Sequence, residues 1–174
     1  MNISIGTETN GSISCPASVN GIVGMKPTVG LVSRSGIIPI SYSQDTAGPM
    51  GKDVKSVAEV LEIISGRDEK DFLTHKIPIS FNFNFTKDLN KNSLQGKRFG
   101  LLKSGYDDIA GKRLIDDLIK IIEKEGGIIF EIDDTRKYPG EYSYFLLLYE
   151  FKTGIENYLI NSNSEYSKLK DIID

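Results

Sequence analysis

Cysteine, histidine and tryptophan are nearly missing from this chain of 174 residues, which contains one Cys, one His and no Trp. A single cysteine, Cys15, excludes an internal disulfide and any zinc site built from several cysteines. His75 lies in a polar stretch with no Asp or Ser at a useful spacing, so a Ser-His-Asp triad is not supported. The sequence also has no HExxH, paired CxxC or P-loop motif. We therefore expect no metal site and no cofactor, and we expect Cys15 to be a small buried side chain.

Strong charge and long apolar runs are also missing. The net charge at pH 7 is −3, which argues against a nucleic-acid partner because such partners usually bind basic surfaces. No run of roughly eighteen apolar residues is present, so we expect no membrane-spanning helix. The first residues, Met1, Asn2 and Ile3, lack the basic region of a signal peptide. We therefore expect a cytoplasmic protein, provided that Met1 lies near the natural start.

The most informative stretch is G-T-E-T-N-G-S-I-S-C-P-A at residues 6–17. A short apolar strand leads into it, and residues 9–11 suit a tight turn because Asn and Gly accept positive φ. Pro16 suits the first turn of a helix, and Asn20-Gly21 would end that helix. This order places Ser12 on a strand–turn–helix elbow. A serine in such an elbow is a candidate nucleophile with an oxyanion hole beside it.

Several motifs in the first fifty residues together resemble one family. They are G-T-E-T-N-G-S-I, P-A, N-G-I-V-G-M-K-P-T, G-L-V-S-R-S-G-I-I-P and S-Q-D-T-A-G-P-M, the last ending at Met50. With these motifs the chain resembles the amidase signature hydrolases, which are serine amidohydrolases with a Ser–Ser–Lys triad. Weaker likeness continues through residues 54–65 and 98–102 to Y-E-F-K at 149–152. The resemblance implies an α/β fold in which residues 1–174 are part of a mixed-sheet amidase domain wrapped by helices.

The resemblance also implies roles for the elbow. Ser12 matches the nucleophile that attacks the carbonyl of a small-molecule amide, so that the C–N bond is cleaved through an acyl-enzyme. The backbone N–H groups of Thr9, Asn10 and Gly11, with that of Ser12 itself, match the oxyanion hole. Asn10 replaces the more usual glycine or aspartate, and Ser14 stands where many members carry arginine. The substrate class is therefore not carried over from the family.

Arg34, Ser35 and Asp45 match further family positions, in a loop rich in Gly, Ser and Pro at residues 31–49. We favour the interpretation that these side chains hydrogen-bond within the loop, because buried loop backbone needs partners. The alternative is that they line the substrate pocket.

Two members of the implied triad, a lysine and a second serine in a Gly-Ser-Ser-Gly-Gly stretch, lie upstream of the nucleophile in the family. Eleven residues precede Ser12 here, so neither has a matching position. A serine hydroxyl is a poor nucleophile without a neighbouring base, and we interpret Lys26 as a structural loop lysine. We therefore expect a central amidase fragment that is close to inactive alone. Two alternatives stay open: a non-catalytic remnant, and a subunit of an amidotransferase-like assembly whose partner carries the missing groups.

The rest of the chain predicts three parts. Residues 1–66 hold the elbow block and a helix at 54–65 that Asp53 caps. Residues 67–92 form a connecting segment that contains I-S-F-N-F-N-F, whose Phe side chains we expect to tuck against the body. Residues 93–174 hold a β-α-β unit and a long helix.

Within the last part, the order strand, helix, strand predicts a parallel pair of strands. The predicted elements are a strand at 97–103, a helix at 110–125, a strand at 128–132 and a helix at 142–160. The final helix is apolar nearly all round, so we expect it to be buried, and a substrate-lining role for one of its tyrosines is the alternative. Open sheet edges predict that the isolated chain self-associates.

Overall fold

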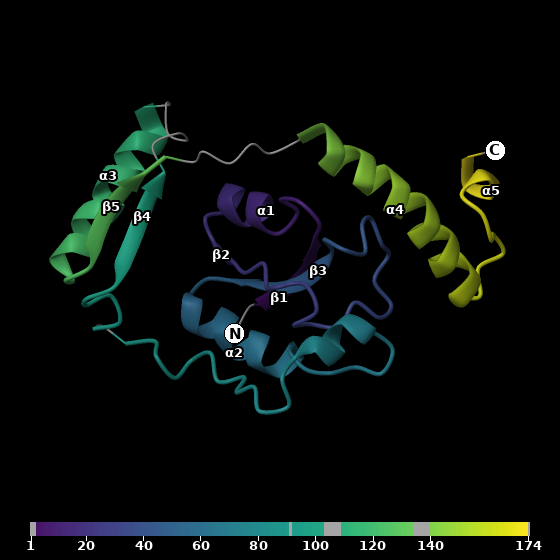
Figure 1. The fold of residues 1–174 in the computed structure, drawn as a ribbon, viewed down its shortest axis with the longest axis horizontal. Helices are drawn as coiled ribbons and strands as arrows, with labels where there is room; N and C mark the ends of the chain where they lie inside the picture. Colours follow the sequence, from purple (N-terminus) through teal and green to yellow (C-terminus); the bar gives the residue numbers. More distant parts are fainter. Residues whose placement is uncertain (1–2, 91, 103–108, 134–139, 174) are drawn as a thin grey trace. The chain divides into compact units, whose positions relative to one another are not determined.

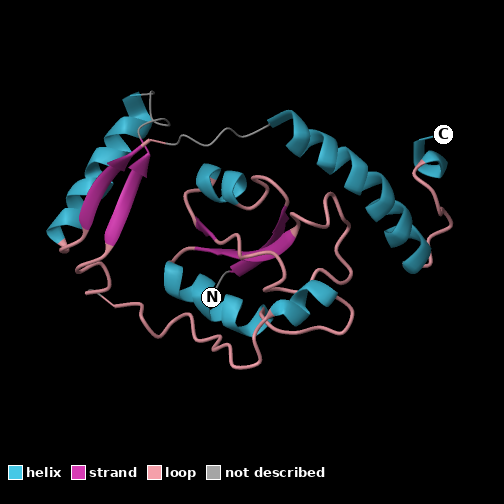
Figure 2. Cartoon of the chain, in the orientation of Figure 1, coloured by secondary structure: helices cyan, strands magenta, loops and turns pink. Residues whose placement is uncertain are grey.

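The computed structural model describes residues 3–90, 92–102, 109–133 and 140–173 (Figure 1). The chain forms two compact units, of which the first is Met1–Lys87 with Pro139–Asp174 and the second is Asp88–Tyr138. Each unit combines helix with a small sheet (Figure 2), which confirms the predicted α/β class. The long helix that sequence analysis grouped with the β-α-β unit clusters by its contacts with the first unit.

The first unit is built on a three-stranded sheet in the order β1-β3-β2. The outer strands β1 (Ile3–Glu8) and β2 (Val23–Gly24) both pair antiparallel with the central strand β3 (Thr46–Gly51). A Cβ on Gly48 of β3 would stand only 2.0 Å from the carbonyl oxygen of Met25. Glycine is therefore required where the chain that leaves β2 crosses the sheet.

Two helices of this unit form as predicted, one between β1 and β2 and the other after β3. α1 (Ser14–Val19) ends at Asn20, and Gly21 then takes a φ of 61° that suits glycine. α2 (Val54–Ile64) begins after Asp53, whose carboxylate accepts a hydrogen bond of 2.8 Å from the backbone N–H three residues later. The predicted Asp53 cap is confirmed. The cap satisfies one of the backbone donors that a helix start leaves without an intrahelical partner.

The core of the first unit lies under α2, which buries one apolar face against β3. Val32, Ala47 and Leu61 form the buried cluster, and partly buried apolar residues pack around it: Leu31, Ile37, Ile64 and Phe85. Phe85 comes from the I-S-F-N-F-N-F stretch, so the prediction that these rings tuck against the body holds for it. Residues 67–90 otherwise form loops and one 3₁₀ helix, η1 (Phe72–Lys76).

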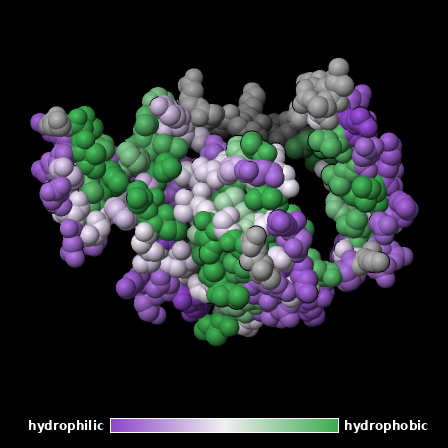
Figure 3. Space-filling view, turned by 180° about the vertical axis from the view of Figure 1, so that it is seen from behind, coloured by the Kyte–Doolittle hydropathy of each residue, from purple (hydrophilic) through white to green (hydrophobic). Residues whose placement is uncertain are grey.

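The first unit also holds α4 (Gly140–Asn161) and α5 (Lys170–Ile173). The expectation that the aromatic-rich helix is buried all round is wrong for its described residues 142–149, where most side chains are exposed. Its buried residues lie further along and are Glu150, Ile155 and Leu159. Only the face that meets the body of the unit is covered, and apolar surface stays open over both units (Figure 3).

The second unit is the predicted β-α-β unit. β4 (Arg98–Leu102) and β5 (Ile128–Ile132) pair in parallel, joined by α3 (Ile109–Lys124). α3 packs on β5 and buries Ile122, whereas much of its remaining apolar face is exposed. The predicted first strand extended to residue 103, which lies outside the described residues. Among the described residues, no helix is both long enough and apolar enough to cross a membrane.

Candidate active site

Ser12 lies on the turn between β1 and α1, where sequence analysis placed it. Its side chain is exposed, and Gly11 before it takes a φ of 99°. This positive φ is available to glycine without strain and turns the chain sharply into the helix. In the part of the chain that the structure describes, no base hydrogen-bonds to the Ser12 hydroxyl. The site thus presents a serine on a tight turn, with no group here to take its proton.

The carboxylate of Glu8 holds this turn in place by accepting backbone hydrogen bonds, a role that sequence analysis missed. The buried Glu8 accepts hydrogen bonds from the backbone N–H groups of Ile13 (2.8 Å) and Ser14 (2.9 Å). Burial would raise the pKa of Glu8, but hydrogen bonds from the backbone N–H groups of Ser14, Gly11 and Ile13 outweigh it and hold the pKa below its ordinary value. The available signal was an acidic residue just before a predicted helix start.

Ile13 anchors the elbow from the residue directly after Ser12. Its side chain is 0% exposed and is the largest fully buried side chain in the described chain. It lies against the strands, because a Cβ on Gly24 or Gly48 would stand 3.1 Å or 3.0 Å from its side-chain carbons. The backbone at Ser12 is therefore held in place by the buried side chain of Ile13 and by the hydrogen bonds that Glu8 accepts from Ile13 and Ser14.

Thr9 and Asp45, two of the sequence-predicted residues, lie in direct contact. The Thr9 hydroxyl donates to Oδ1 of Asp45 at 2.5 Å, and both residues are buried. Oδ2 of Asp45 accepts from the backbone N–H groups of Ile40 and Ser41, each at 2.9 Å. Asp45 therefore ties the turn before Ser12 to the loop that precedes β3.

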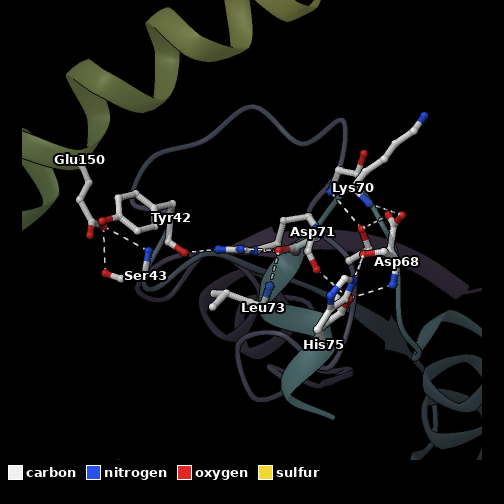
Figure 4. Close-up of polar contacts among 12 residues, drawn as sticks. Tyr42, Ser43, Asp68, Lys70, Asp71, Leu73, His75 and Glu150 are labelled. Atoms are coloured by element: carbon white, nitrogen blue, oxygen red, sulfur yellow. Dashed lines mark hydrogen bonds and ion pairs between the residues drawn. The ribbon is translucent and has the colours of Figure 1, made fainter. Parts of the chain in front are cut away.

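Arg34 lies in a largely buried ion pair with Asp71, which sequence analysis missed. Nε and Nη2 of Arg34 donate to the two carboxylate oxygens of Asp71 at 2.8 Å and 2.6 Å, and Nη1 donates to the carbonyl oxygen of Tyr42 (Figure 4). The side chains are 12% and 4% exposed. Hydrogen bonding from Arg34 lowers the pKa of Asp71 from 3.8 to about 2. The pair joins the glycine-rich loop to the start of η1.

Glu150 on α4 is a further buried carboxylate that sequence analysis did not single out. Its Oε2 accepts from the hydroxyl of Ser43 (2.9 Å) and the backbone N–H of Ser43 (3.2 Å) (Figure 4). It also accepts from the hydroxyl of Ser41 (2.5 Å). A buried carboxylate needs such donors because desolvation disfavours the charge. Glu150 lies within Y-E-F-K, so the weak family likeness there was the available signal.

Arg34, Ser35 and Asp45 line one pocket of about 370 Å³ together with residues of α4. Ser35 is exposed, and its backbone N–H donates to the hydroxyl of Ser33 at 3.1 Å. Ser12 does not line this pocket. The structure therefore gives Arg34 and Asp45 hydrogen bonds that hold the loop and, at the same time, positions on the pocket wall.

Three further residues that sequence analysis weighed are exposed. Cys15 is exposed on α1, which corrects the expectation of a buried side chain; the buried position on this short helix goes to Ala17 instead. Lys26 and His75 are exposed. Within the described residues, no three His, Cys, Asp or Glu side chains cluster as ligands of a metal ion.

Known proteins are similar to this chain in sequence and, where solved, in fold. The native peptide amidase from Stenotrophomonas maltophilia is 43% identical, superimposes with a TM-score of 0.89, and is matched over 98% of this chain and 36% of its own. A putative amidase of Schizosaccharomyces pombe is 36% identical over 98% of this chain and 33% of that protein. A glutamyl-tRNA(Gln) amidotransferase subunit of Clostridium botulinum is 40% identical over 71% of this chain and 25% of that protein.

The chain thus spans about a third or less of the length of each of these relatives. The family model named Amidase matches residues 1–174. With a match over that full range and the same fold in a peptide amidase, the chain belongs to the amidase signature family.

Proposed function

We propose that this chain carries the nucleophile of an amide hydrolase. Ser12 attacks the carbonyl carbon of a C–N amide, and the N–H groups of Thr9, Asn10 and Gly11, with that of Ser12, hold the oxyanion. The amine leaves, and water then hydrolyses the acyl ester on Ser12. Hydrogen-bond donors fixed before the reaction stabilise charge that develops in the transition state.

The observation that carries the proposal is that Ser12 is exposed on a turn whose neighbouring residues are fixed by buried contacts. The turn is held by Glu8 beneath, by the buried Ile13 after it and by the Thr9–Asp45 contact before it. Glu8 also engages the N–H of Gly11, which further fixes the turn that carries the four proposed donors. A hydroxyl held in place by its backbone is suited to repeated attack on a bound carbonyl.

We further propose that the isolated chain is close to inactive. The sequence contains no Gly-Ser-Ser-Gly-Gly stretch to match the second serine of the family, and no described base hydrogen-bonds to Ser12. Loss of a triad member in serine hydrolases lowers kcat by about 10⁴ to 10⁶. The outer strands β1 and β2 and the exposed apolar residues of α4 also favour self-association of the chain alone.

A chimera tests the role of Ser12. This chain replaces the matching stretch of the Stenotrophomonas maltophilia peptide amidase, to which it is 43% identical, and release of ammonia from a peptide amide is measured. We expect the chimera to be active and its Ser12→Ala variant to lose about 10⁴-fold or more in kcat. Ser18→Ala, the same change on an exposed position of α1, is the matched control and should keep full activity.

Two results would contradict this proposal. The first is a Ser12→Ala chimera as active as Ser18→Ala, which would remove the nucleophile role. The second is steady amide turnover by the 174-residue chain alone that Ser12→Ala abolishes, which would remove the claim of incompleteness.

An amidotransferase-like role is the second candidate, favoured by the likeness to the Clostridium botulinum glutamyl-tRNA(Gln) amidotransferase. In that case the amide substrate serves as an ammonia donor and the chain works beside a partner protein. Hydrolysis by the chimera without any added partner favours the simple amidase instead. An inactive chimera with an intact fold would favour the non-catalytic remnant.

A further inference from the structure

The pocket beside Arg34 has the size and lining of a small-molecule site. Its volume of about 370 Å³ falls within the range of roughly 300–1,000 Å³ that is typical of ligand pockets. Its apolar and aromatic lining residues are Ile37, Pro39, Tyr42, Phe72 and Tyr158. Such a lining with a few polar groups is the usual composition of a site for an organic ligand.

The charged side chains of Arg34 and Asp45, which line the pocket, are already hydrogen-bonded to other groups of the protein. Arg34 is paired with Asp71 through two hydrogen bonds. Both oxygens of Asp45 accept hydrogen bonds, from the Thr9 hydroxyl and from backbone N–H groups. Lys70, the other charged lining residue, is exposed. A charged ligand group would therefore find no unpaired buried partner here, whereas a neutral apolar group would bury against the rings.

The α4 wall of the pocket is held in place by Glu150. Its carboxylate accepts three hydrogen bonds from Ser41 and Ser43. One turn later, Gly154 lies against Pro39, since a Cβ there would stand 3.1 Å from Pro39 Cγ. These contacts fix α4 against the loop, so Tyr158, one turn further on, keeps a set place in the lining.

Asp45 links the pocket to the elbow. It lines the pocket and also accepts the hydrogen bond from Thr9, three residues before Ser12. Asp45 is therefore a lining residue of the pocket that is hydrogen-bonded to the segment leading into the proposed nucleophile.

We propose that this pocket binds the uncharged apolar side group of the amide substrate, an aromatic ring or a branched aliphatic chain, with Tyr158 as a specificity-determining residue and Glu150 as a positioning residue. The inference rests on the proposed function, because it takes the ligand to be an amide. It adds the substrate class, which the family likeness leaves open.

Binding of model amides to the ¹⁵N-labelled chain, followed by NMR, tests the inference without requiring turnover. The probes are N-acetyl-phenylalaninamide, N-acetyl-glycinamide and N-acetyl-lysinamide, which share the amide and differ in the side group. We expect the phenylalanine amide to bind about tenfold or more tightly than the other two, because its ring is buried against the apolar lining. The shifted signals should include those of Phe72 and Tyr158.

Matched variants decide whether the pocket is responsible. Tyr158→Ala should remove the tenfold preference, whereas Tyr149→Ala, the same change at a 75% exposed position of α4, should keep it. Asn157→Phe fills the pocket from an exposed lining position and should also abolish it without disturbing a buried contact. Glu150→Leu should lower the preference, and Glu150→Gln, which keeps an acceptor oxygen, should restore most of it at equal melting temperature.

Equal affinity for the three amides, or equal behaviour of Tyr158→Ala and Tyr149→Ala, would overturn the inference. Ser12→Ala should bind all three probes like the unaltered chain. A binding preference that persists beside an inactive chimera would mean that the pocket stands and the proposed hydrolysis fails. If the chimera is active but this chain shows no binding preference among the three amides, the proposed hydrolysis stands and the pocket inference fails.

Discussion

The two units of this chain are stabilised in different ways. The first joins irregular loops through buried polar contacts between distant residues, such as Thr9 with Asp45 and Arg34 with Asp71. The second is a regular β-α-β unit held by a parallel strand pair and one amphipathic helix, and the ion pair of Lys120 with Asp117 on that helix is exposed. The candidate chemistry lies in the first unit.

The difference shows why the loops around a site need more residues of fixed identity than a regular unit does. A regular unit satisfies its backbone through its own ladder and helix, so an apolar pattern is sufficient to specify it. Loops that surround a site have no such ladder, so their backbone groups need side-chain partners from elsewhere in the chain. Each of those partners then becomes a position where one substitution has a large effect.

The largest expected effect is on stability, and it distinguishes the Arg34–Asp71 pair of the first unit from the exposed Lys120–Asp117 pair of the second. Asp71→Ala leaves Arg34 buried without its partner and should lower the free energy of unfolding of the first unit by about 3–5 kcal/mol. Asp117→Ala removes an exposed partner of Lys120 and should change the second unit by less than about 1 kcal/mol. Residue-resolved hydrogen exchange reads the two units separately. Equal losses of stability in the two variants would contradict this comparison. Partial recovery of stability in the double variant Arg34→Met/Asp71→Leu would support it, because that variant leaves no unpaired charge.

The next effect compares two strand glycines. Gly48→Ala brings a Cβ to 2.0 Å from a backbone oxygen of Met25, whereas Gly100→Ala in β4 meets only the end of the Ile132 side chain at 2.8 Å. Backbone cannot swing aside as a side-chain methyl can, so we expect a loss of about 3 kcal/mol for Gly48→Ala and less than about 1 kcal/mol for Gly100→Ala. Denaturant melts of both variants would check this, and a well-folded Gly48→Ala would contradict the close crossing.

Acid should act on the first unit through Asp71. Its pKa is lowered from 3.8 to about 2 in the folded chain, so its stabilising contribution is fully present above pH 3.8 and is lost as the pH falls toward 2. Linkage sets this loss at about 2 kcal/mol. Urea melts at pH 5 and pH 2 would measure it against Asp71→Asn, which cannot titrate. The idea fails if the two chains lose the same stability over this interval.

The smallest expected effect is local to the elbow. Glu8→Gln keeps the side-chain shape but replaces charge-assisted hydrogen bonds to Ile13 and Ser14 by neutral ones, which should cost about 1 kcal/mol. Amide exchange at these two residues should become faster. Asp53→Asn, the same kind of change at the α2 cap, should leave exchange at the elbow unchanged; acceleration by both variants alike would indicate general loosening.

Local pattern was sufficient to predict much of this structure. The α2 helix with its Asp53 cap, the turn that carries Ser12, and the parallel strands β4 and β5 all follow from nearby residues. Each depends on interactions within about one helix turn or one strand–helix–strand unit. Cys15 and most of residues 142–149 of α4 were predicted as buried and are exposed, because apolar character does not say which neighbour is available to cover a side chain.

The sequence by itself determined the family, through motifs concentrated in the first fifty residues, and the backbone elements that place Ser12 on an elbow. Only the tertiary structure decided which polar groups pair. Asp71 lies 37 residues from Arg34, and Glu150 lies 109 residues from Ser41. A hydrogen bond needs its two atoms within about 3 Å, and no local periodicity reports which distant atoms the fold brings that close.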